Sequence, residues 1–150
     1  WHLLGMFAPS FVTGHLIRRF GVLNVMIAGV ALYVACVAVN LAGTDVAHFW
    51  AALFLLGVGW NFLFVGGTTL LTETYTEAEK AKAQALNDFA VFTVITLSSL
   101  SAGALQHYFG WRTVNLGVVP LIVMILATLL WLRQARKAQA RMAAGTVGVD

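Results

Sequence analysis

The sequence predicts an all-α integral membrane protein, a polytopic bundle of transmembrane helices. Of its 150 residues, 60% are hydrophobic and only 10% are charged, whereas an ordinary soluble domain is about 25% charged. The mean hydropathy is +0.84. Four stretches without Lys, Arg, Asp or Glu are long enough to cross a hydrocarbon core of about 30 Å: residues 20–44, 46–72, 89–111 and 113–132. These observations exclude a soluble globular domain.

Five membrane segments are expected within residues 1–133, at residues 1–13, 22–41, 49–71, 89–108 and 114–132. The first segment begins as Trp-His-Leu-Leu-Gly, without an initiator Met or a basic leader, so we interpret it as the remainder of a longer helix. The chain is then the C-terminal part of a longer protein, and residues 134–150 form a cytoplasmic tail. Three Trp side chains fall at segment ends, where indole rings favour the headgroup layer: Trp50, Trp111 and Trp131.

The basic residues predict the orientation of the segments. Only Arg112 falls on one side of the predicted membrane, whereas eight basic residues fall on the other: Arg18, Arg19, Lys80, Lys82, Arg133, Arg136, Lys137 and Arg141. Cytoplasmic loops carry the excess of Lys and Arg, so the sequence predicts a protein of the plasma (cytoplasmic) membrane with a cytoplasmic C-terminus. Residues 42–48 and the turn around Gly110 then face outward.

The longest connection, residues 72–88, is expected to contain a short cytoplasmic helix. Thr76 and Glu79 have the spacing of a capping box, in which two side chains satisfy exposed amides at a helix start. The Ala-rich residues 80–86 favour continuation of that helix. A solvated connector is the alternative.

Polar side chains divide the segments into two kinds. The first, third and fourth segments each carry a polar face at helical spacing. In the first segment it consists of His2, Met6, Pro9 and Thr13. In the third it consists of Gly57, Asn61, Phe64 and Thr68, and in the fourth of Phe92, Thr96, Ser99, Gly103 and Gln106. The second and fifth segments have almost no polar side chains at depth. We expect those two to face lipid and the other three to face protein or a water-filled cavity.

His2 and Asn61 are the main candidates for contact with a solute. His2 lies 11 positions before Thr13, about 16 Å along a helix, which places its imidazole near the bilayer centre, where it needs a partner or water. Thr68, Thr96 and Ser99 lie on the same polar faces and are further candidates for the solute path. The alternatives are that His2 and Asn61 bond neighbouring helices and that the hydroxyls bond their own helix backbone.

No motif for enzymatic chemistry is present. The sequence contains no Walker-type phosphate loop, no His-Glu-x-x-His motif and no Gly-x-Ser-x-Gly elbow. Its single cysteine, Cys36, lies inside an apolar segment, which excludes an internal disulfide and a thiolate metal cluster. We therefore expect no catalytic residue, no metal site and no cofactor. The short basic clusters between apolar spans also argue against nucleic acid as a partner.

The connection after the first segment reads Gly14-His15-Leu16-Ile17-Arg18-Arg19-Phe20-Gly21. It resembles the loop signature of the major facilitator superfamily, Gly-x-Leu-x-Asp-Arg-x-Gly followed by two basic residues, through Gly14, Leu16, Arg19 and Gly21. Arg18 replaces the Asp, and Val22 and Leu23 replace the basic pair, as in a degenerate second-half copy. Glu73 and Lys80 are similar to the family's Glu-x6-Arg element, and Gly110-Trp111-Arg112 looks like the Gly-Trp-Arg that precedes a final helix.

This resemblance implies that the segments are helices eight to twelve of a twelve-helix transporter, with the eighth, tenth and eleventh helices lining the central path. It implies secondary active transport of a small organic solute by alternating access, by a permease whose N-terminal half is missing here. It also implies a cytoplasmic latch between Arg19 and Glu73. A non-transporting membrane subunit with an assembly role is the chief alternative, and a membrane enzyme is the third.

Overall fold

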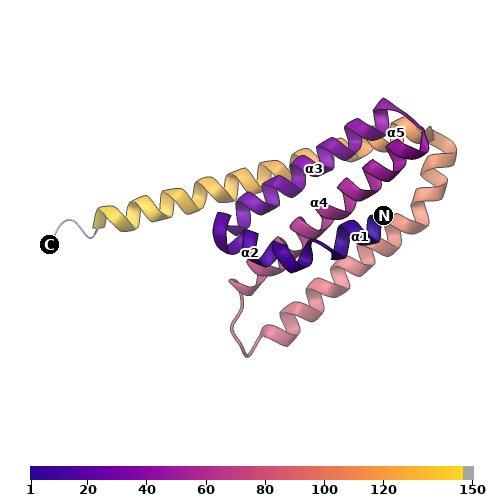
Figure 1. Ribbon diagram of the computed structural model, residues 1–150. Helices are drawn as coiled ribbons and strands as arrows, with labels where there is room; N and C mark the ends of the chain where they lie inside the picture. The colour runs from indigo at the N-terminus through magenta and orange to yellow at the C-terminus, as the bar shows by residue number, and fades with distance from the viewer. Residues whose placement is uncertain (147–150) are drawn as a thin grey trace.

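The structure is a computed structural model that describes residues 1–146. It contains five α-helices: α1 (His2–Phe7), α2 (Ser10–Phe20), α3 (Val22–Ala42), α4 (Val46–Thr72) and α5 (Lys80–Thr146) (Figure 1). Within this range there is no β-strand, so the all-α prediction is confirmed. Three of the helices, α3, α4 and α5, are long and apolar enough to cross a membrane.

The first predicted segment is longer than expected and is broken in the middle. The break lies at Ala8 and Pro9, because the proline ring has no N–H and excludes the carbonyl of the preceding turn. Beyond it, α2 continues past residue 13 to Phe20. Residues 14–20, expected to form a loop, are therefore helical. They contain no second proline, and a single glycine does not end a helix that packs against its neighbours.

A single residue, Gly21, turns the chain from α2 into α3. Its φ of 84° and ψ of 148° lie in a region that side chains rarely adopt, and its N–H donates to the Ile17 carbonyl over 2.8 Å. Gly21 of the loop signature thus has a direct backbone role.

The longest helix, α5, reverses direction at Gly110, where φ is 75° and ψ is 165°. We call residues 80–109 the N-terminal limb and residues 111–146 the C-terminal limb. The N-terminal limb contains the fourth predicted segment and the C-terminal limb contains the fifth. The two limbs diverge from the bend at Gly110 (Figure 1). The predicted tail at residues 134–150 is helical as far as Thr146, because no helix-breaking residue separates it from the apolar span. Residues 147–150 of that tail lie outside the described part.

No separate short helix occupies residues 72–88, because α5 starts at Lys80 and continues directly into its apolar span. The expected cap is formed in part. The Thr76 N–H donates to the Glu79 carboxylate over 3.2 Å, as in a capping box. The Thr76 hydroxyl, however, donates to the same carboxylate over 2.8 Å instead of accepting an amide hydrogen.

The apolar core lies between α3 and the C-terminal limb of α5. Leu23, Met26 and Val30 of α3 pack against Ile122 and Leu129. Helix α3 also packs closely on α4, so it lies between α4 and the C-terminal limb. These are the two segments expected to face lipid. Each of them buries one apolar stripe against the other and keeps further apolar side chains exposed, among them Val34, Val123 and Met124, so the expectation that they also face lipid stays a prediction.

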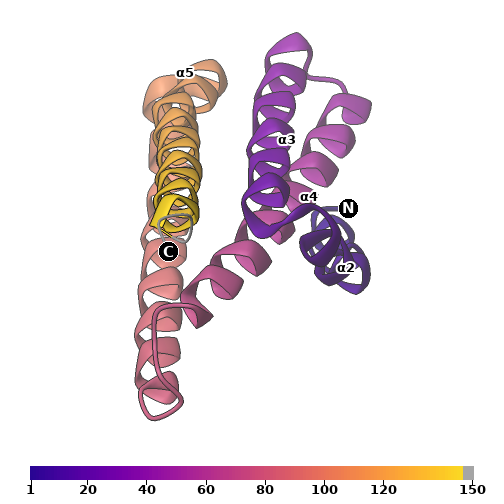
Figure 2. The same ribbon diagram turned by 90° about the vertical axis from the view of Figure 1, so that its left-hand side faces the viewer.

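Figure 2 shows the two limbs of α5 as one layer, with α3 and α4 beside it and α2 on the far side of α4. The Gly21 turn, the connection from α4 to α5 and the end of α5 lie at one end of the bundle (Figure 1). The connection at residues 43–45 and the bend at Gly110 lie at the other end. The eight basic residues on one predicted side are therefore gathered at one end of the molecule.

Candidate functional site

Two glycines bring α1 against α4. A Cβ atom added to Gly57 would overlap the carbonyl oxygen of His2, and one added to Gly5 would lie 2.6 Å from the carbonyl oxygen of Phe54. Both glycines are buried. Small residues let membrane helices approach until backbone atoms touch, and this contact places the polar groups of both helices within bonding distance.

His2 lies at the start of this contact and binds α4 through its backbone. Its Nδ1 atom is 3.2 Å from the carbonyl oxygen of Leu53. Because a carbonyl oxygen only accepts, Nδ1 carries the hydrogen, and a neutral ring then presents Nε2 as an acceptor. Among residues 1–146, Nε2 has no hydrogen-bond partner. His2 thus combines a fixed ring with one unused nitrogen.

Asn61 joins α4 to both sides of the break at Pro9. Its Nδ2 atom donates to the Met6 carbonyl over 2.7 Å and to the Ser10 hydroxyl over 2.6 Å. Its Oδ1 atom is 2.5 Å from the Thr13 hydroxyl, whose single hydrogen is shared with the Pro9 carbonyl at 2.8 Å. We call Met6, Ser10, Thr13 and Asn61 the amide seam.

The centre of the amide seam is closed to solvent, whereas Ser10 at its edge is exposed. Asn61 is 3% exposed and Thr13 is 0% exposed. Both Asn61 donor hydrogens are used, so the amide has no donor left for a solute. This geometry favours the helix-bridging alternative for Asn61 over direct solute contact. Sequence reasoning did not single out Ser10, although its position directly after Pro9 and four residues after Met6 was a usable signal.

Two of the three predicted polar faces therefore meet each other. The face of α1 and α2 that carries Met6 and Thr13 packs on Gly57 and Asn61 of α4. Thr68 lies outside this contact, half-buried, and donates to the Phe64 carbonyl of its own helix over 2.8 Å. The third face is separate from the other two.

That third face lies on the N-terminal limb of α5, where residues 92–110 are all exposed. The Thr96 hydroxyl donates to the Phe92 carbonyl over 2.8 Å, and Ser99 is exposed on the same face. The structure does not bring Thr96 or Ser99 to His2 or Asn61.

An apolar chamber of about 430 Å³ lies between the N-terminal limb and the pair α3 and α4. Tyr33, Trp60 and Phe64 line one side, and Val91, Val94 and Ile95 line the other. The rings of Trp60 and Phe64 are stacked, with centroids 5.5 Å apart and an interplanar angle of 15°. Sequence reasoning missed this chamber, because its lining residues come from three helices and are spread along the chain from Tyr33 to Ile125.

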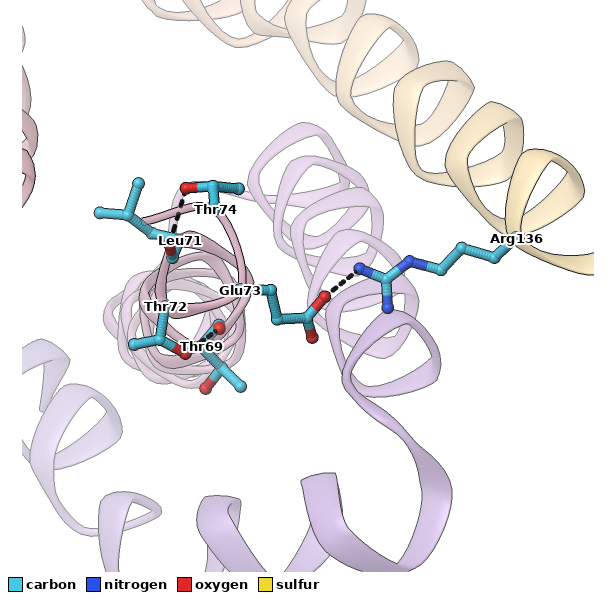
Figure 3. A network of polar contacts seen from close by, with 6 residues as sticks. All are labelled: Thr69, Leu71, Thr72, Glu73, Thr74 and Arg136. Atoms are coloured by element: carbon cyan, nitrogen blue, oxygen red, sulfur yellow. Dashed lines mark hydrogen bonds and ion pairs between the residues drawn. The ribbon is translucent and has the colours of Figure 1, made fainter. Parts of the chain in front are cut away.

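The predicted latch between Arg19 and Glu73 is not present. Glu73 instead pairs with Arg136 of the C-terminal limb, with 2.5 Å between its Oε2 atom and the guanidinium (Figure 3). The Arg19 guanidinium lies over the ring of Phe20, 5.4 Å from the centroid. Lys80 pairs with Glu77 at 3.5 Å. Arg136 was not predicted as the partner of Glu73, because residues 134–150 were expected to form a tail. In the structure α5 continues through these residues and places Arg136 beside the end of α4.

Two further residues of the loop signature lie in α2. Apart from the local helix backbone, no atom lies within 4 Å of a Cβ built on Gly14, and Leu16 is half-buried. At the end of α4, the hydroxyls of Thr72 and Thr74 donate to the carbonyls of Thr69 and Leu71 over 2.6 Å and 2.7 Å (Figure 3). These bonds close the helix end from which Glu73 projects.

Metal ligands do not gather in the part of the chain that the structure describes. There, no group of three His, Cys, Asp or Glu side chains is placed to hold an ion. Polar side chains within the long apolar helices bond another helix, as Asn61 does, bond their own helix backbone, as Thr68 and Asn115 do, or lie exposed on the N-terminal limb.

Long apolar helices that bury a hydrogen-bonded seam define a polytopic helical membrane protein. The chain belongs to the Major Facilitator Superfamily, whose family model matches residues 2–146. This match is to a family of transporters and not of enzymes.

Curated relatives agree with this assignment. The riboflavin transporter RfnT of Brucella anthropi is 46% identical over 130 residues, which cover 87% of this chain and 33% of the relative. The uncharacterized MFS-type transporter YdeG of Bacillus subtilis is 37% identical, over 71% of this chain and 24% of the relative. The multidrug transporter MdfA of Yersinia pestis is 34% identical, over 73% of this chain and 26% of the relative. The chain thus spans about a third or less of the length of these relatives. No solved structure gives a significant match.

Proposed function

We propose that this chain supplies helices eight to twelve of a secondary transporter, which moves a small organic solute by alternating access between two six-helix halves. The observation that carries the proposal is the uncovered polar face of the N-terminal limb of α5, within a segment long enough to span the membrane. Thr96 bonds its own helix, but the Ser99 hydroxyl and the Gln106 amide on this face have no partner among residues 1–146 and need water, solute or another protein surface, because lipid offers them none. A second half of the transporter and a solute path supply these partners.

The proposed path is lined by His2, Thr68, Thr96 and Ser99, and Asn61 supports it from behind. His2 offers the unused Nε2 acceptor, and Ser99 and Thr96 offer hydroxyls on the exposed face. Asn61 uses its donors to hold the broken helix α1–α2 on α4. Its role in transport is therefore to fix the position of His2.

For the solute, we propose a compound with a planar ring system and polar substituents. The relative RfnT is named a riboflavin transporter, and MdfA is named a multidrug transporter. The stacked Trp60 and Phe64 rings in the apolar chamber provide a surface of matching chemistry. The polar groups of the solute would then bond the His2 and Ser99 side chains.

The test is uptake or efflux of labelled riboflavin and of planar dyes by the intact transporter in proteoliposomes. Losing one hydrogen bond to the solute costs about 1 to 3 kcal/mol, so His2→Ala should weaken apparent affinity by about 5- to 150-fold. Asn40→Ala is the control, since the one hydrogen bond of its side chain within residues 1–146 is to the Cys36 sulfur of its own helix at 3.7 Å. If both variants bind and transport like the unmodified protein, this path assignment is wrong.

The orientation is part of the same proposal. We place the Gly21 turn, the connection at residues 73–79 and the C-terminus in the cytoplasm, because the basic residues gather at that end. Cysteines introduced at Arg18 and Lys80 should be shielded from an impermeant thiol reagent added outside cells, and one at Asp45 should react. The reverse labelling would overturn the orientation.

An assembly subunit remains the second candidate, favoured by the closed amide seam. A polar face whose donors are all used by neighbouring helices needs no solute to explain it. Transport by the reconstituted protein separates the two functions, because an assembly subunit moves no solute.

A further inference from the structure

A groove of about 320 Å³ separates the start of α3 from the C-terminal limb of α5 at the basic end of the bundle. Residues 21–24 form one wall, and Arg133, Arg136, Lys137 and Ala140 form the other. These four α5 positions follow the i, i+3, i+4, i+7 spacing of one helix face. In both ribbon views the start of α3 lies beside this part of α5 (Figures 1 and 2). We call this feature the basic groove.

Two positive charges in the basic groove are not compensated. Glu73 pairs with Arg136. Among residues 1–146, neither Arg133 nor Lys137 forms an ion pair. Clustered like charges repel one another, so a bound anion would lower the electrostatic free energy of the groove.

The start of α3 adds uncapped amide groups to the opposite wall. This helix begins without a side-chain cap, and its first amides have no acceptor within the helix. The Asn24 side chain does not serve as a cap, because its Nδ2 atom donates to the Phe20 carbonyl over 2.8 Å. The positive end of the α3 dipole therefore acts together with Arg133 and Lys137.

The depth of the basic groove indicates which anion it meets. Arg133 directly follows the charge-free residues 113–132, and the groove wall at residues 21–24 lies at the start of the charge-free residues 20–44. Both walls thus lie where the hydrocarbon core gives way to headgroups. Val22 and Leu23 supply apolar surface beside the charges.

We propose that the basic groove binds the phosphate of an anionic phospholipid, with its acyl chains against the apolar surface of α3 and the C-terminal limb. Arg133 and Lys137 bind the phosphate, the α3 amides face it, and the methyl group of Ala140 leaves it room. This site requires only that the chain spans a membrane, so it is independent of the proposed solute path.

The experiment measures lipid retained by the intact transporter. The protein is purified from nanodiscs of phosphatidylglycerol or of phosphatidylcholine, and bound lipid is counted by native mass spectrometry. We expect phosphatidylglycerol to be retained over phosphatidylcholine. Each basic residue near a membrane surface contributes about 1 kcal/mol, so Arg133→Gln and Lys137→Gln should each weaken retention about fivefold. Arg133→Lys should keep most of it.

Two matched controls distinguish a site from diffuse charge. Lys82→Gln removes a charge at the same end of the bundle from the other limb, and Arg112→Gln removes one at the opposite end, so neither should alter retention. Ala140→Leu keeps every charge but fills the groove, so it should reduce retention.

Three results would overturn the proposal. Equal losses in Lys82→Gln and Arg133→Gln would mean a general surface effect. Equal retention of phosphatidylglycerol and phosphatidylcholine would mean that the groove does not select lipids by the charge of their headgroups. Displacement of phosphatidylglycerol by millimolar inorganic phosphate would mean that the groove serves a soluble anion.

Discussion

The amide seam and the polar face of the N-terminal limb have the same sequence pattern and opposite surroundings. Both are polar side chains at helical spacing within charge-free stretches. In the seam, Asn61 is 3% exposed and bonds three residues of α1 and α2. On the limb, Thr96 bonds its own helix, and the side chains of residues 92–110 lie exposed. A polar stripe therefore identifies a helix face that needs a partner, but not which partner it has.

The largest expected effect is on the glycine contact that makes the seam possible. In Gly57→Val the new side chain meets the His2 carbonyl, which would separate α1 from α4 and destabilise the intact transporter by about 3 kcal/mol. Thermal unfolding in detergent measures this loss. Gly67→Val is the matched control on the same helix, because apart from the local helix backbone no atom lies within 4 Å of a Cβ at that position. Equal melting temperatures for the two variants would contradict the close contact.

Asn61→Ala should destabilise the protein by about 2 kcal/mol, since it removes bonds to Met6, Ser10 and Thr13 in a buried site. Solute affinity should fall with stability in this variant, because the position of His2 depends on the seam. Asn40→Ala, melted in parallel, should unfold at the temperature of the unmodified protein. If Asn61→Ala weakens solute affinity and leaves unfolding unchanged, Asn61 contacts the solute directly.

The exposed face of the N-terminal limb should respond in the opposite way. Ser99→Ala and Thr96→Ala should each change the free energy of unfolding by less than about 0.5 kcal/mol, as at other exposed positions. Their apparent solute affinity should weaken about fivefold if a hydroxyl bonds the solute. A loss of stability without a change in affinity would place this face in a packing contact like the seam.

The pair of Glu73 and Arg136 should contribute less than about 1 kcal/mol, because both side chains are close to half exposed. Glu73→Arg and Arg136→Glu should each lower transport, and the double exchange should restore part of it. Arg19→Glu should have little effect, since Arg19 contacts the Phe20 ring. Rescue of Arg19→Glu by Glu73→Arg would instead support the pairing that the sequence predicted.

The smallest effect is expected at the start of the N-terminal limb. Hydrogen bonds from the Thr76 side chain and then its backbone lower the pKa of the Glu79 carboxyl. A carboxyl with a lowered pKa in the folded protein stabilises the fold above its ordinary pKa, and this contribution disappears as the pH falls through the lowered value. Protection factors at residues 80–83, which correct for the intrinsic pH dependence of amide exchange, should therefore fall at acidic pH in the unmodified protein. Glu79→Gln should lower these protection factors at neutral pH and remove most of their pH dependence.

Local features of the sequence predicted most of the fold. Charge-free stretches of membrane length coincide with α3, α4 and the two limbs of α5, because a long apolar helix in lipid satisfies its own backbone and needs no particular neighbour. Gly21 and Gly110 were singled out by motif, and both adopt a positive φ that glycine tolerates best. The loop signature also indicated the family, which the match over residues 2–146 confirms.

Pairing between distant residues was decided only by the tertiary structure. The spacing of Asn61 predicted that it would need a partner, but Met6, Ser10 and Thr13 become its partners only because Gly5 and Gly57 let α1 touch α4. Glu73 likewise meets Arg136 instead of Arg19, because the C-terminal limb continues as a helix and carries Arg136 to the end of α4. Periodicity and charge act within one segment, whereas a hydrogen bond or ion pair between segments depends on how closely and at what depth two helices pack.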